Sequence, residues 1–342
     1  MVYVLGIDGG GTKTVCLLID ETGNILSRGQ AGSSNYQTGG IDSAKNAIET
    51  AINQAISIFL DHKNYNNILI QGLGIGLAGV GRKEDFNVIQ NLVEQVKTNS
   101  NLSINWELTT NSTVIKSDSM IALVGGLGHQ VGIVAIAGTG SQIFGQNSQG
   151  KTKRVGGWGY LLGDEGSGYY IAISGLKAAL KSHDGRLGST QLISAFKHHL
   201  NLDNLESLIE VVYRRGWTVS QIANLAKIVD EVARKGDEIA NQIINTAIEE
   251  LVFATKIAID SLFEPNESVE IVTIGGVFQG MNNFRLKFIE SLNQIAPTAR
   301  LILPRYEPAY GAGILALNAL GYFPVNTGLD ETQTDPSTNL LN

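Results

Sequence analysis

The sequence predicts an α/β protein of two domains, and three observations support this prediction. The chain has 342 residues, more than the roughly 100 to 200 residues of a typical single domain. Short apolar runs typical of strands alternate with segments of helical periodicity. A strand, a glycine-rich turn and a returning strand occur at residues 2–19 and again at residues 131–145, which indicates a duplicated domain.

The composition indicates a soluble globular protein. Apolar residues make up 43% of the chain and charged residues 17%, with a net charge of −7, so a disordered chain is excluded. The acidic balance argues against a broad nucleic-acid or anionic-membrane surface. The single cysteine excludes an intramolecular disulfide, and we expect a cytoplasmic protein. Glycine occurs 40 times, well above its usual share of about 7%, so we expect these glycines to have specific positions.

The first half of the chain begins with strands and continues with alternating helices and strands. Residues 2–7 form an apolar run too short for a helix, and a second such run follows the glycine turn. Residues 42–60 and 83–96 place apolar side chains at helical spacing. The strands expected in this half are residues 2–7, 14–19, 25–28, 68–77 and 113–116.

The second half repeats this order. An apolar strand at residues 131–137 leads through the glycine turn 138–141 into a returning strand at 142–145. The helices expected after it are residues 167–181, 220–235, 237–263, 281–292 and 311–320, with strands at 269–274 and 300–303. The polar, aperiodic tail at residues 323–342 is predicted to be disordered.

The two glycine turns are candidate phosphate sites. Successive N–H groups of a tight turn form an anion-binding concavity, and glycine lets the backbone approach a phosphate closely. In the first turn Thr12 and Lys13 add a hydroxyl and a cation, and Asp8 is placed to hold Mg²⁺ directly or through water. An ordinary hairpin is the alternative for either turn alone. Two such turns, each after an apolar strand, favour phosphate binding.

Two common phosphate-binding motifs do not fit. A P-loop, G-x-x-x-x-G-K-[ST], counted from Gly6 has Thr12 where lysine is required. Residues 74–79 match G-x-G-x-x-G but lack the following strand and acidic residue of a dinucleotide-binding domain. The apolar run at residues 15–19 predicts a strand after the first turn, whereas both motifs open a helix.

Four segments resemble one protein family. They read GIDGGGTKT, DSMIALVGGLGHQVGIVAIAGTGS, VGGWGYLLGDEGSGYYIA and IGGV. Together they are similar to the N-acetylglucosamine kinase branch of the BadF/BadG/BcrA/BcrD ATPase family, from residue 3 to about residue 320. The GGWG and GDEGS segments are highly specific, whereas DGGGT and GTGS alone indicate only the superfamily.

The resemblance implies the actin-like ATPase or sugar kinase fold, in which two ribonuclease-H-like α/β domains are separated by an interdomain cleft that binds ATP. We place the N-terminal domain at residues 1–118 and the C-terminal domain at residues 119–310. The helix at residues 311–321 is expected to pack back on the first domain. The resemblance also implies ATP and Mg²⁺ as cofactors, an amino sugar as second substrate, and a homodimer.

Asp118 is the candidate general base. A kinase acting on a sugar hydroxyl needs a carboxylate that orients the hydroxyl and accepts its proton. Asp118 follows the strand at residues 113–116 and begins an expected helix, so it should lie at the carboxyl end of a strand, facing the cleft. Its spacing from the GTGS turn also resembles that of the family's catalytic aspartate. Two alternatives stay open: Asp118 caps the helix, or Asn111 is the matching residue and the chain lacks the base.

The resemblance assigns further residues to the two substrates. The ATP-binding candidates are Gly10, Gly11, Thr12, Lys13, Thr139, Gly140, Ala223, Gly275 and Gly276. The sugar-binding candidates are Asn35, Asp118, Gly157, Trp158, Gly159 and Asp164. Packing within the protein is the alternative role for Ala223 and Trp158. Gln37 stands where the animal member of the family has an aromatic residue, so N-acetylglucosamine, glucosamine and other amino sugars stay open.

The sequence therefore predicts an ATP-dependent kinase that phosphorylates the 6-hydroxyl of N-acetylglucosamine or a related amino sugar. Two other functions were weighed. A BadF-type activator ATPase requires cysteine ligands for a cluster, and this chain has only Cys16. A non-catalytic sensor of amino sugar or nucleotide would bind sugar without releasing ADP.

Overall fold

The computed structural model describes residues 1–63, 65–80, 83–214 and 216–324. Its described residues fall into two compact units, which we call unit 1 (residues 1–129 and 305–324) and unit 2 (residues 130–304). The helix that begins at Asp118 lies in unit 1, whereas the sequence-based division was drawn directly after that residue. The predicted disorder of the tail falls, from residue 325 on, outside the described residues.

Unit 1 is built on a five-stranded sheet with the order β3-β2-β1-β5-β7. β1 (Tyr3–Gly9) and β2 (Thr14–Asp20) form an antiparallel hairpin, and β3 (Ile25–Ala31) pairs antiparallel with β2. On the other side of β1, β5 (Gly72–Leu77) and β7 (Thr113–Ser117) continue the sheet in parallel. The predicted order of strand, glycine turn and returning strand is thus confirmed.

The strand predicted at residues 68–77 is in fact two strands. β4 (Ile68–Ile70) pairs with β6 (Ile104–Trp106) in a separate two-stranded parallel sheet, whereas β5 joins the main sheet. The change falls at Gln71, whose N–H donates to the carbonyl of Tyr3 at 2.9 Å. Apolar periodicity does not distinguish one long strand from two short ones with different partners.

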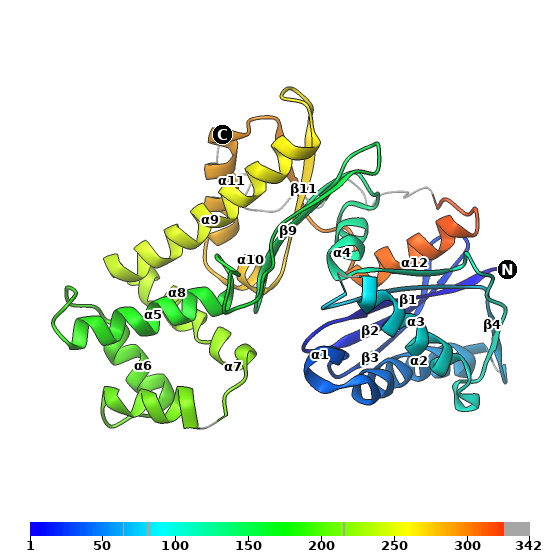
Figure 1. Cartoon of the computed structure of the whole chain (residues 1–342), viewed down its shortest axis with the longest axis horizontal. Helices are drawn as coiled ribbons and strands as arrows, with labels where there is room; N and C mark the ends of the chain where they lie inside the picture. Colours follow the sequence, from blue (N-terminus) through cyan, green and yellow to red (C-terminus); the bar gives the residue numbers. More distant parts are fainter. Residues whose placement is uncertain (64, 81–82, 215, 325–342) are drawn as a thin grey trace. The chain divides into compact units, whose positions relative to one another are not determined.

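Helices cover both faces of the unit 1 sheet (Figure 1). α2 (Ile41–Lys63) and α3 (Lys83–Lys97) enclose a buried apolar core on one face. α4 (Asp118–Leu127) and α12 (Pro308–Ala319) cover the other. Two short helices complete the unit, α1 (Tyr36–Gly39) and η1 (Ser100–Leu102).

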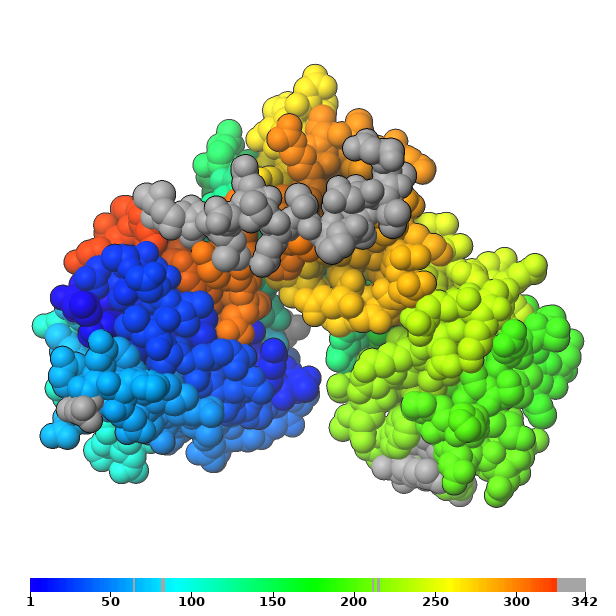
Figure 2. Space-filling model, turned by 180° about the vertical axis from the view of Figure 1, so that it is seen from behind, coloured from blue at the N-terminus to red at the C-terminus, as the bar shows by residue number. Residues whose placement is uncertain are grey.

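α12 lies directly on the sheet because glycines face it. A Cβ added at Gly6 of β1 would lie 2.1 Å from the carbonyl oxygen of Ala309. A Cβ at Gly74 of β5 would lie 1.8 Å from the carbonyl oxygen of Ala312. Figure 2 shows this C-terminal helix in orange and red beside the blue N-terminal segments.

Unit 2 repeats the sheet of unit 1. Its order is β10-β9-β8-β11-β12, with two antiparallel pairs followed by two parallel pairs, as in unit 1. These strands are β8 (Gly132–Ala137), β9 (Ser141–Gln146), β10 (Thr152–Gly156), β11 (Val269–Ile274) and β12 (Ala299–Ile302). The prediction of a repeated hairpin is confirmed, although β10 was not predicted.

Unit 2 carries more helices than unit 1. The long α9 packs against α5, α8 and α11 and against the sheet. The helices are α5 (Gly168–His183), α6 (Leu192–Leu200), α7 (Val219–Ala223), α8 (Ala226–Arg234), α9 (Glu238–Leu262), α10 (Gly276–Gly280) and α11 (Phe284–Ile295), with the short η2 (Leu205–Ser207) and η3 (Glu210–Arg214). α6 was not predicted, and the helix predicted at residues 220–235 is the separate pair α7 and α8. Among the described residues, no helix is long and apolar enough to span a bilayer.

Candidate functional site

The C-terminal edge of the unit 1 sheet brings the charged candidates together. β1, β5 and β7 run parallel, and Gly9 pairs with Leu77, which in turn pairs with Ser117. Asp8 precedes Gly9 and Asp118 follows Ser117, so both carboxylates belong to one sheet edge. Neighbouring strands lie about 4.8 Å apart, so the two strand ends are separated by roughly 10 Å.

Asp118 is the first residue of α4, and it is not the N-cap. The cap is Ser117, whose hydroxyl oxygen accepts from the N–H of Met120 at 3.2 Å. Asp118 Oδ1 accepts from the N–H of Ser119 at 2.7 Å. The capping alternative was therefore wrong by one residue. Asn111, the other alternative, lies in the turn before β7, at the opposite end of that strand.

The electrostatics of unit 1 centre on Asp8. Its pKa is raised from 3.8 to about 7, chiefly because the carboxyl group is buried and next because of the charge of Asp118. The Lys13 ammonium lowers this pKa, and the carboxylate of Glu307 raises it. A cation beside Asp8 would favour the charged carboxylate and reverse this shift.

The first glycine turn leaves its tip open to solvent. The N–H of Gly10 donates to the carbonyl of Lys13 at 2.9 Å and closes the turn. Gly11, Thr12 and Lys13 are exposed, and a Cβ added at Gly11 would meet no other atom within 4 Å. The turn therefore has room for a ligand at its tip, as a phosphate site requires.

A second loop is hydrogen-bonded to this turn. The carbonyl of Gly10 accepts from the N–H of Ser34 and from the hydroxyl of Ser33, each at 3.2 Å. The next residue, Asn35, caps α1, because its Oδ1 accepts from the N–H of Gln37 at 3.1 Å. The predicted sugar residue Asn35 is thus connected to the predicted phosphate turn through the two residues that precede it, Ser33 and Ser34.

In unit 2, the corresponding turn is held against the start of α5. The N–H of Gly138 donates to the carbonyl of Gly140 at 2.9 Å and closes the turn. The carbonyls of Gly138 and Thr139 accept from the N–H groups of Gly168 and Tyr169, at 2.8 and 3.3 Å. Thr139 itself is exposed, and a Cβ at Gly138 would meet nothing within 4 Å.

The nucleoside candidates of unit 2 lie around Gly138. Gly275 has a φ of 114°, and a Cβ there would lie 2.2 Å from the carbonyl oxygen of Ala137. A Cβ at Gly168 would lie 3.0 Å from the carbonyl of Gly138 and 3.2 Å from that of Ala223. Ala223 is buried and packs in this region. Gly276 is exposed and begins α10.

Asp164 lies in direct contact with this turn. A Cβ added at Gly140 would lie 2.7 Å from Asp164 Oδ2, and Asp164 Oδ1 accepts from the N–H of Gly159 at 3.2 Å. Burial raises the pKa of Asp164, and hydrogen bonds from the backbone of Gly159 and Ser141 oppose that rise. Asp164 also has a φ of +61°, a left-handed conformation that costs a residue other than glycine on the order of 1–3 kcal/mol.

Trp158 is exposed and does not pack in the core of unit 2. Its side chain is 67% exposed, and the guanidinium carbon of Arg154 lies 4.9 Å from the ring centroid. Its neighbours Gly157 and Gly159 both adopt positive φ, at 70° and 87°. The loop therefore presents an aromatic face to solvent beside Asp164, to which Gly159 donates its hydrogen bond.

The chain matches the profile of the BadF/BadG/BcrA/BcrD ATPase family over residues 5–316. It belongs to this family. Membership implies that the chain uses ATP, and it confirms the predicted family resemblance. The glycine turns and the GGWG and GDEGS segments can therefore be considered as features of a family member.

Two relatives extend over nearly the whole chain. The N-acetylmuramic acid/N-acetylglucosamine kinase of Clostridium acetobutylicum is 34% identical over 92% of this chain and 98% of its own length. The N-acetyl-D-glucosamine kinase of Dictyostelium discoideum is 32% identical over 92% and 98%. A protein of Chromobacterium violaceum assigned as an N-acetylglucosamine kinase has the same fold, with a TM-score of 0.71 at 24% identity over 92% of this chain and 99% of its own. The predicted fold class is confirmed.

Metal binding can be considered only for the residues that the structure describes. Among the residues that the structure describes, no group of three or more His, Cys, Asp or Glu could hold a metal ion. Mg²⁺ at nucleotide sites usually takes one or two carboxylates together with phosphate oxygens and waters. Asp8, at the base of an open turn, fits that donor set, and Mg²⁺ stays a proposal.

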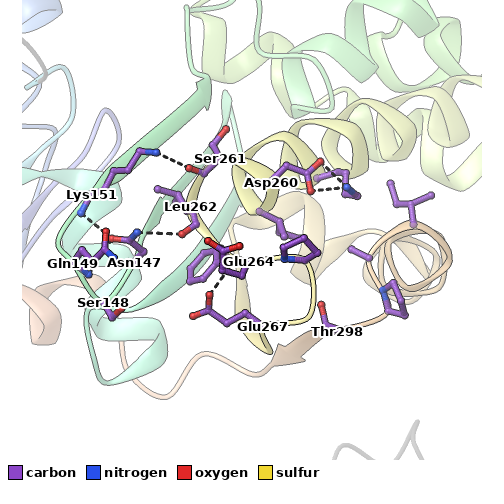
Figure 3. Close-up of a pocket in the computed structure, with 17 residues that line it drawn as sticks. Asn147, Ser148, Gln149, Lys151, Asp260, Ser261, Leu262, Glu264, Glu267 and Thr298 are labelled. Carbon is purple, nitrogen blue, oxygen red and sulfur yellow. Dashed lines mark hydrogen bonds and ion pairs between the residues drawn. The ribbon is translucent and has the colours of Figure 1, made fainter.

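One cavity of unit 2 lies away from these candidate residues. It has a volume of about 610 Å³ and lies between the β9–β10 turn and the carboxyl ends of α9 and α11 (Figure 3). Lys151 and Asn147 donate there to the carbonyls of Ser261 and Leu262, at 2.9 and 3.1 Å. None of the predicted site residues lines it.

Sequence analysis missed Glu307 as a member of the unit 1 edge. Glu307 is the N-cap residue of α12, and its carboxylate accepts from Arg28 Nε of β3 at 2.9 Å. Its charge also acts on Asp8. The Glu-Pro pair marks Glu307 as the residue before the helix, because proline is favoured in the first turn of a helix. Nothing in the sequence connects it with Arg28, from which it is 279 residues away.

Proposed function

We propose that this chain is an ATP-dependent kinase that transfers a phosphoryl group to the 6-hydroxyl of N-acetylglucosamine or a closely related amino sugar. The observation that carries the proposal is the position of Asp118, on the same sheet edge as Asp8 and the first glycine turn. Both extended relatives are named as kinases of N-acetylglucosamine, at 34% and 32% identity, which supports the choice of sugar.

Asp118 acts in this proposal as the general base. Its carboxylate accepts the proton of the sugar hydroxyl while the hydroxyl oxygen bonds to the γ-phosphorus of ATP. The bond from that phosphorus to the bridging oxygen breaks, and ADP leaves. A base in this role typically contributes about 10² to 10⁴ in rate. Asn111 lies at the other end of β7, and we do not assign it to the reaction.

The two glycine turns bind the phosphates in this proposal. In unit 1, Gly10, Gly11 and Thr12 offer an open backbone turn, and Lys13 offers a positive charge. In unit 2, Thr139 and Gly140 offer an uncharged turn, with Ala223, Gly275 and Gly276 toward the nucleoside. Such positioning and charge stabilisation account for most of the catalysis in phosphoryl transfer.

Asp8 is the residue that we propose for Mg²⁺. Bound Mg²⁺ would neutralise charge on the β- and γ-phosphates. The raised pKa of Asp8 supports this role, because a buried carboxyl beside a second carboxylate, that of Asp118, is stabilised in its charged form by a cation.

Asn35 in unit 1 and Asp164 in unit 2 are the polar groups proposed for the sugar hydroxyls. Sugar sites combine a few fixed polar groups with an apolar surface that covers the ring. The exposed ring of Trp158, between Gly157 and Gly159, provides such a surface. The conformation of Asp164 is fixed by the backbone around it, so its carboxylate is preorganised.

The activator ATPase alternative is not supported. The chain has one cysteine, and Cys16 is fully buried in β2, where burial raises the pKa of its thiol. A buried thiol of raised pKa offers no thiolate ligand to a cluster.

A coupled assay of ADP release tests the proposal. It would compare N-acetylglucosamine, N-acetylmuramic acid, glucosamine, N-acetylmannosamine and glucose at equal concentrations with Mg·ATP. We expect the largest kcat/KM for N-acetylglucosamine. ADP release that none of these sugars accelerates would contradict the proposal, and sugar binding without ADP release would favour a sensor.

Two further proposals concern the location and the assembly of the protein. We place the protein in the cytoplasm because its single cysteine is a free, buried thiol. We also propose that the chain forms a homodimer, on the basis of its resemblance to the family. Cell fractionation and light scattering of the purified chain test these two proposals directly.

A further inference from the structure

One hydroxyl joins the phosphate turn of unit 2 to the loop that carries Asp164. Ser141, the first residue of β9, is 7% exposed, and its Oγ donates to the carbonyl oxygen of Glu165 at 2.6 Å. The backbone of Ser141 also donates to the Asp164 carboxylate. A single residue thus holds two consecutive residues of the loop.

The loop around Asp164 has an unusual backbone conformation. Asp164 has a φ of +61° and Gly166 a φ of +82°, so both residues are left-handed. Asp164 also accepts hydrogen bonds from the N–H of Gly159 at its carboxylate and from the N–H of Ser167 at its carbonyl. The Ser141 hydroxyl donates to the carbonyl of Glu165. It therefore restrains the peptide group that joins Glu165 to Gly166, between the two residues of positive φ.

The turn and the loop also touch directly. The oxygen Asp164 Oδ2 would lie 2.7 Å from a Cβ at Gly140, so no side-chain atom separates the carboxylate from the backbone of the turn. A shift of the turn upon binding phosphate therefore reaches Asp164 by contact, and the Ser141 hydroxyl makes the two segments move together.

We propose that Ser141 is a positioning residue that couples the sugar site at Asp164 to the phosphate site at residues 138–140. The proposal rests on the proposed kinase function. Binding of nucleotide holds the turn, the turn holds Asp164 through Ser141, and the sugar then binds more tightly. Linkage requires the reverse as well, so sugar tightens nucleotide binding by the same factor.

Calorimetric titration measures this coupling. The Kd of N-acetylglucosamine is determined without nucleotide and with saturating Mg²⁺ and a non-hydrolysable ATP analogue, and the ratio of the two values is the coupling factor. Coupled sites typically show factors of about 5 to 150, and we expect the wild-type chain in that range. We expect Ser141→Ala to reduce the factor at least threefold, and Ser141→Thr, which keeps the hydroxyl, to restore most of it.

A matched control separates coupling from loss of stability. Thr255 is buried in α9, and its hydroxyl donates to the carbonyl of Leu251 at 2.7 Å. Thr255→Val removes a buried hydroxyl bond from the same unit, so it should lower the melting temperature without changing the coupling factor. An equal fall in the factor for Thr255→Val and Ser141→Ala would assign the effect to stability and overturn the proposal.

The outcomes distinguish this proposal from the function on which it rests. Kinase turnover with a wild-type coupling factor near 1, or an unchanged factor in Ser141→Ala, overturns the role of Ser141 and leaves the kinase function intact. Absence of sugar-dependent ADP release in the wild type rejects the function itself. If Ser141→Ala does not fold, Ser141→Cys replaces the hydroxyl by a thiol, a much weaker donor. The coupling factor should then fall, and a factor equal to that of the wild type would contradict the proposal.

Discussion

The two glycine turns occupy the same position in two matching sheets, yet they carry different chemistry. In unit 1 the hairpin pairs Gly9 with Thr14 and leaves the four residues 10–13 in the turn. In unit 2 it pairs Ala137 with Ser141 and leaves the three residues 138–140. The residue before the last paired one is Asp8 in unit 1 and Ile136 in unit 2.

The two units differ in the charge that surrounds their glycine turns, which suggests different roles for the two sheets. Unit 1 gathers charge at its sheet edge, where the charges of Asp118, Lys13 and Glu307 all act on Asp8. Unit 2 offers an uncharged turn, and its ionisable site residue Asp164 comes from a separate loop. In the proposed function, unit 1 would therefore supply the groups that handle charge and protons, and unit 2 the surface that positions the substrates.

The largest effect should come from the proposed base in unit 1. Asp118→Asn retains the shape but cannot accept the proton, so we expect kcat to fall by about 10² to 10⁴ while the Kd of the sugar changes little. Steady-state kinetics with calorimetry measures both. Asn111→Ala is the matched control and should keep kcat within about twofold, since surface changes away from a site usually have small effects. A kcat near that of the wild type in Asp118→Asn rejects this base.

The charge of Asp8 should also be measurable through stability. The folded pKa of about 7 exceeds the unfolded value of 3.8, so the folded state keeps a proton that the unfolded state loses. Stability from Asp8 is full below about pH 4 and is lost as the pH rises through about 7. Asp8→Asn should therefore gain roughly 2–4 kcal/mol relative to the wild type between pH 4 and pH 8.

Urea unfolding of both proteins at several pH values, without Mg²⁺ or nucleotide, measures this gain. Titrating groups that do not interact with Asp8 cancel in the difference between the two curves. If the free energies of unfolding of the two proteins changed with pH in parallel, the charged form of Asp8 would not be destabilising. The charge of Asp8 would then not distinguish it energetically from Ile136, its counterpart in unit 2.

Unit 2 should respond to shape more than to charge. Gly140→Ala places a methyl 2.7 Å from Asp164 Oδ2, so Asp164 must shift, and we expect the KM for sugar to rise about tenfold, a change of about 1.4 kcal/mol. Gly138→Ala is the comparison, because its methyl meets no atom of the protein within 4 Å. It should affect the KM for ATP and not the melting temperature. If the two variants raised the KM for sugar equally, the effect of Gly140→Ala could not be attributed to its contact with Asp164.

The smallest effect should come from the ion pair of Arg28 and Glu307. The two side chains are 42% and 33% exposed, and exposed pairs contribute about 0–1 kcal/mol. Arg28→Gln should therefore lower the free energy of unfolding by less than about 1 kcal/mol. A larger loss, measured by urea unfolding, would show that this pair anchors α12 to the sheet edge.

Much of this fold could be predicted because its signals are local. The hairpins around residues 10–13 and 138–140 follow from apolar runs interrupted by glycine, and Asp118 could be placed at a strand end. β10 could not be predicted in this way, because its sequence TKRVG shows no alternation of apolar and polar residues. The division of residues 68–77 depends on distant pairing with β6, which periodicity does not reveal.

The site was predicted less completely than the fold for the same reason. Single residues could be proposed where a motif surrounds them, as with Asp8, Lys13 and Asp164. The contacts that connect them were not, because the carbonyl of Glu165 and the carboxylate of Glu307 reach residues far away in the sequence. Their proposed roles await the experiments above.

Identification of the product tests the central claim most directly. The wild-type chain would be incubated with Mg·ATP and N-acetylglucosamine, and the product analysed by phosphorus and proton NMR together with the amount of ADP formed. The account predicts one phosphate ester on the 6-hydroxyl for each ADP released. Free phosphate formed at the same rate with and without sugar, or an ester at another hydroxyl, would contradict it.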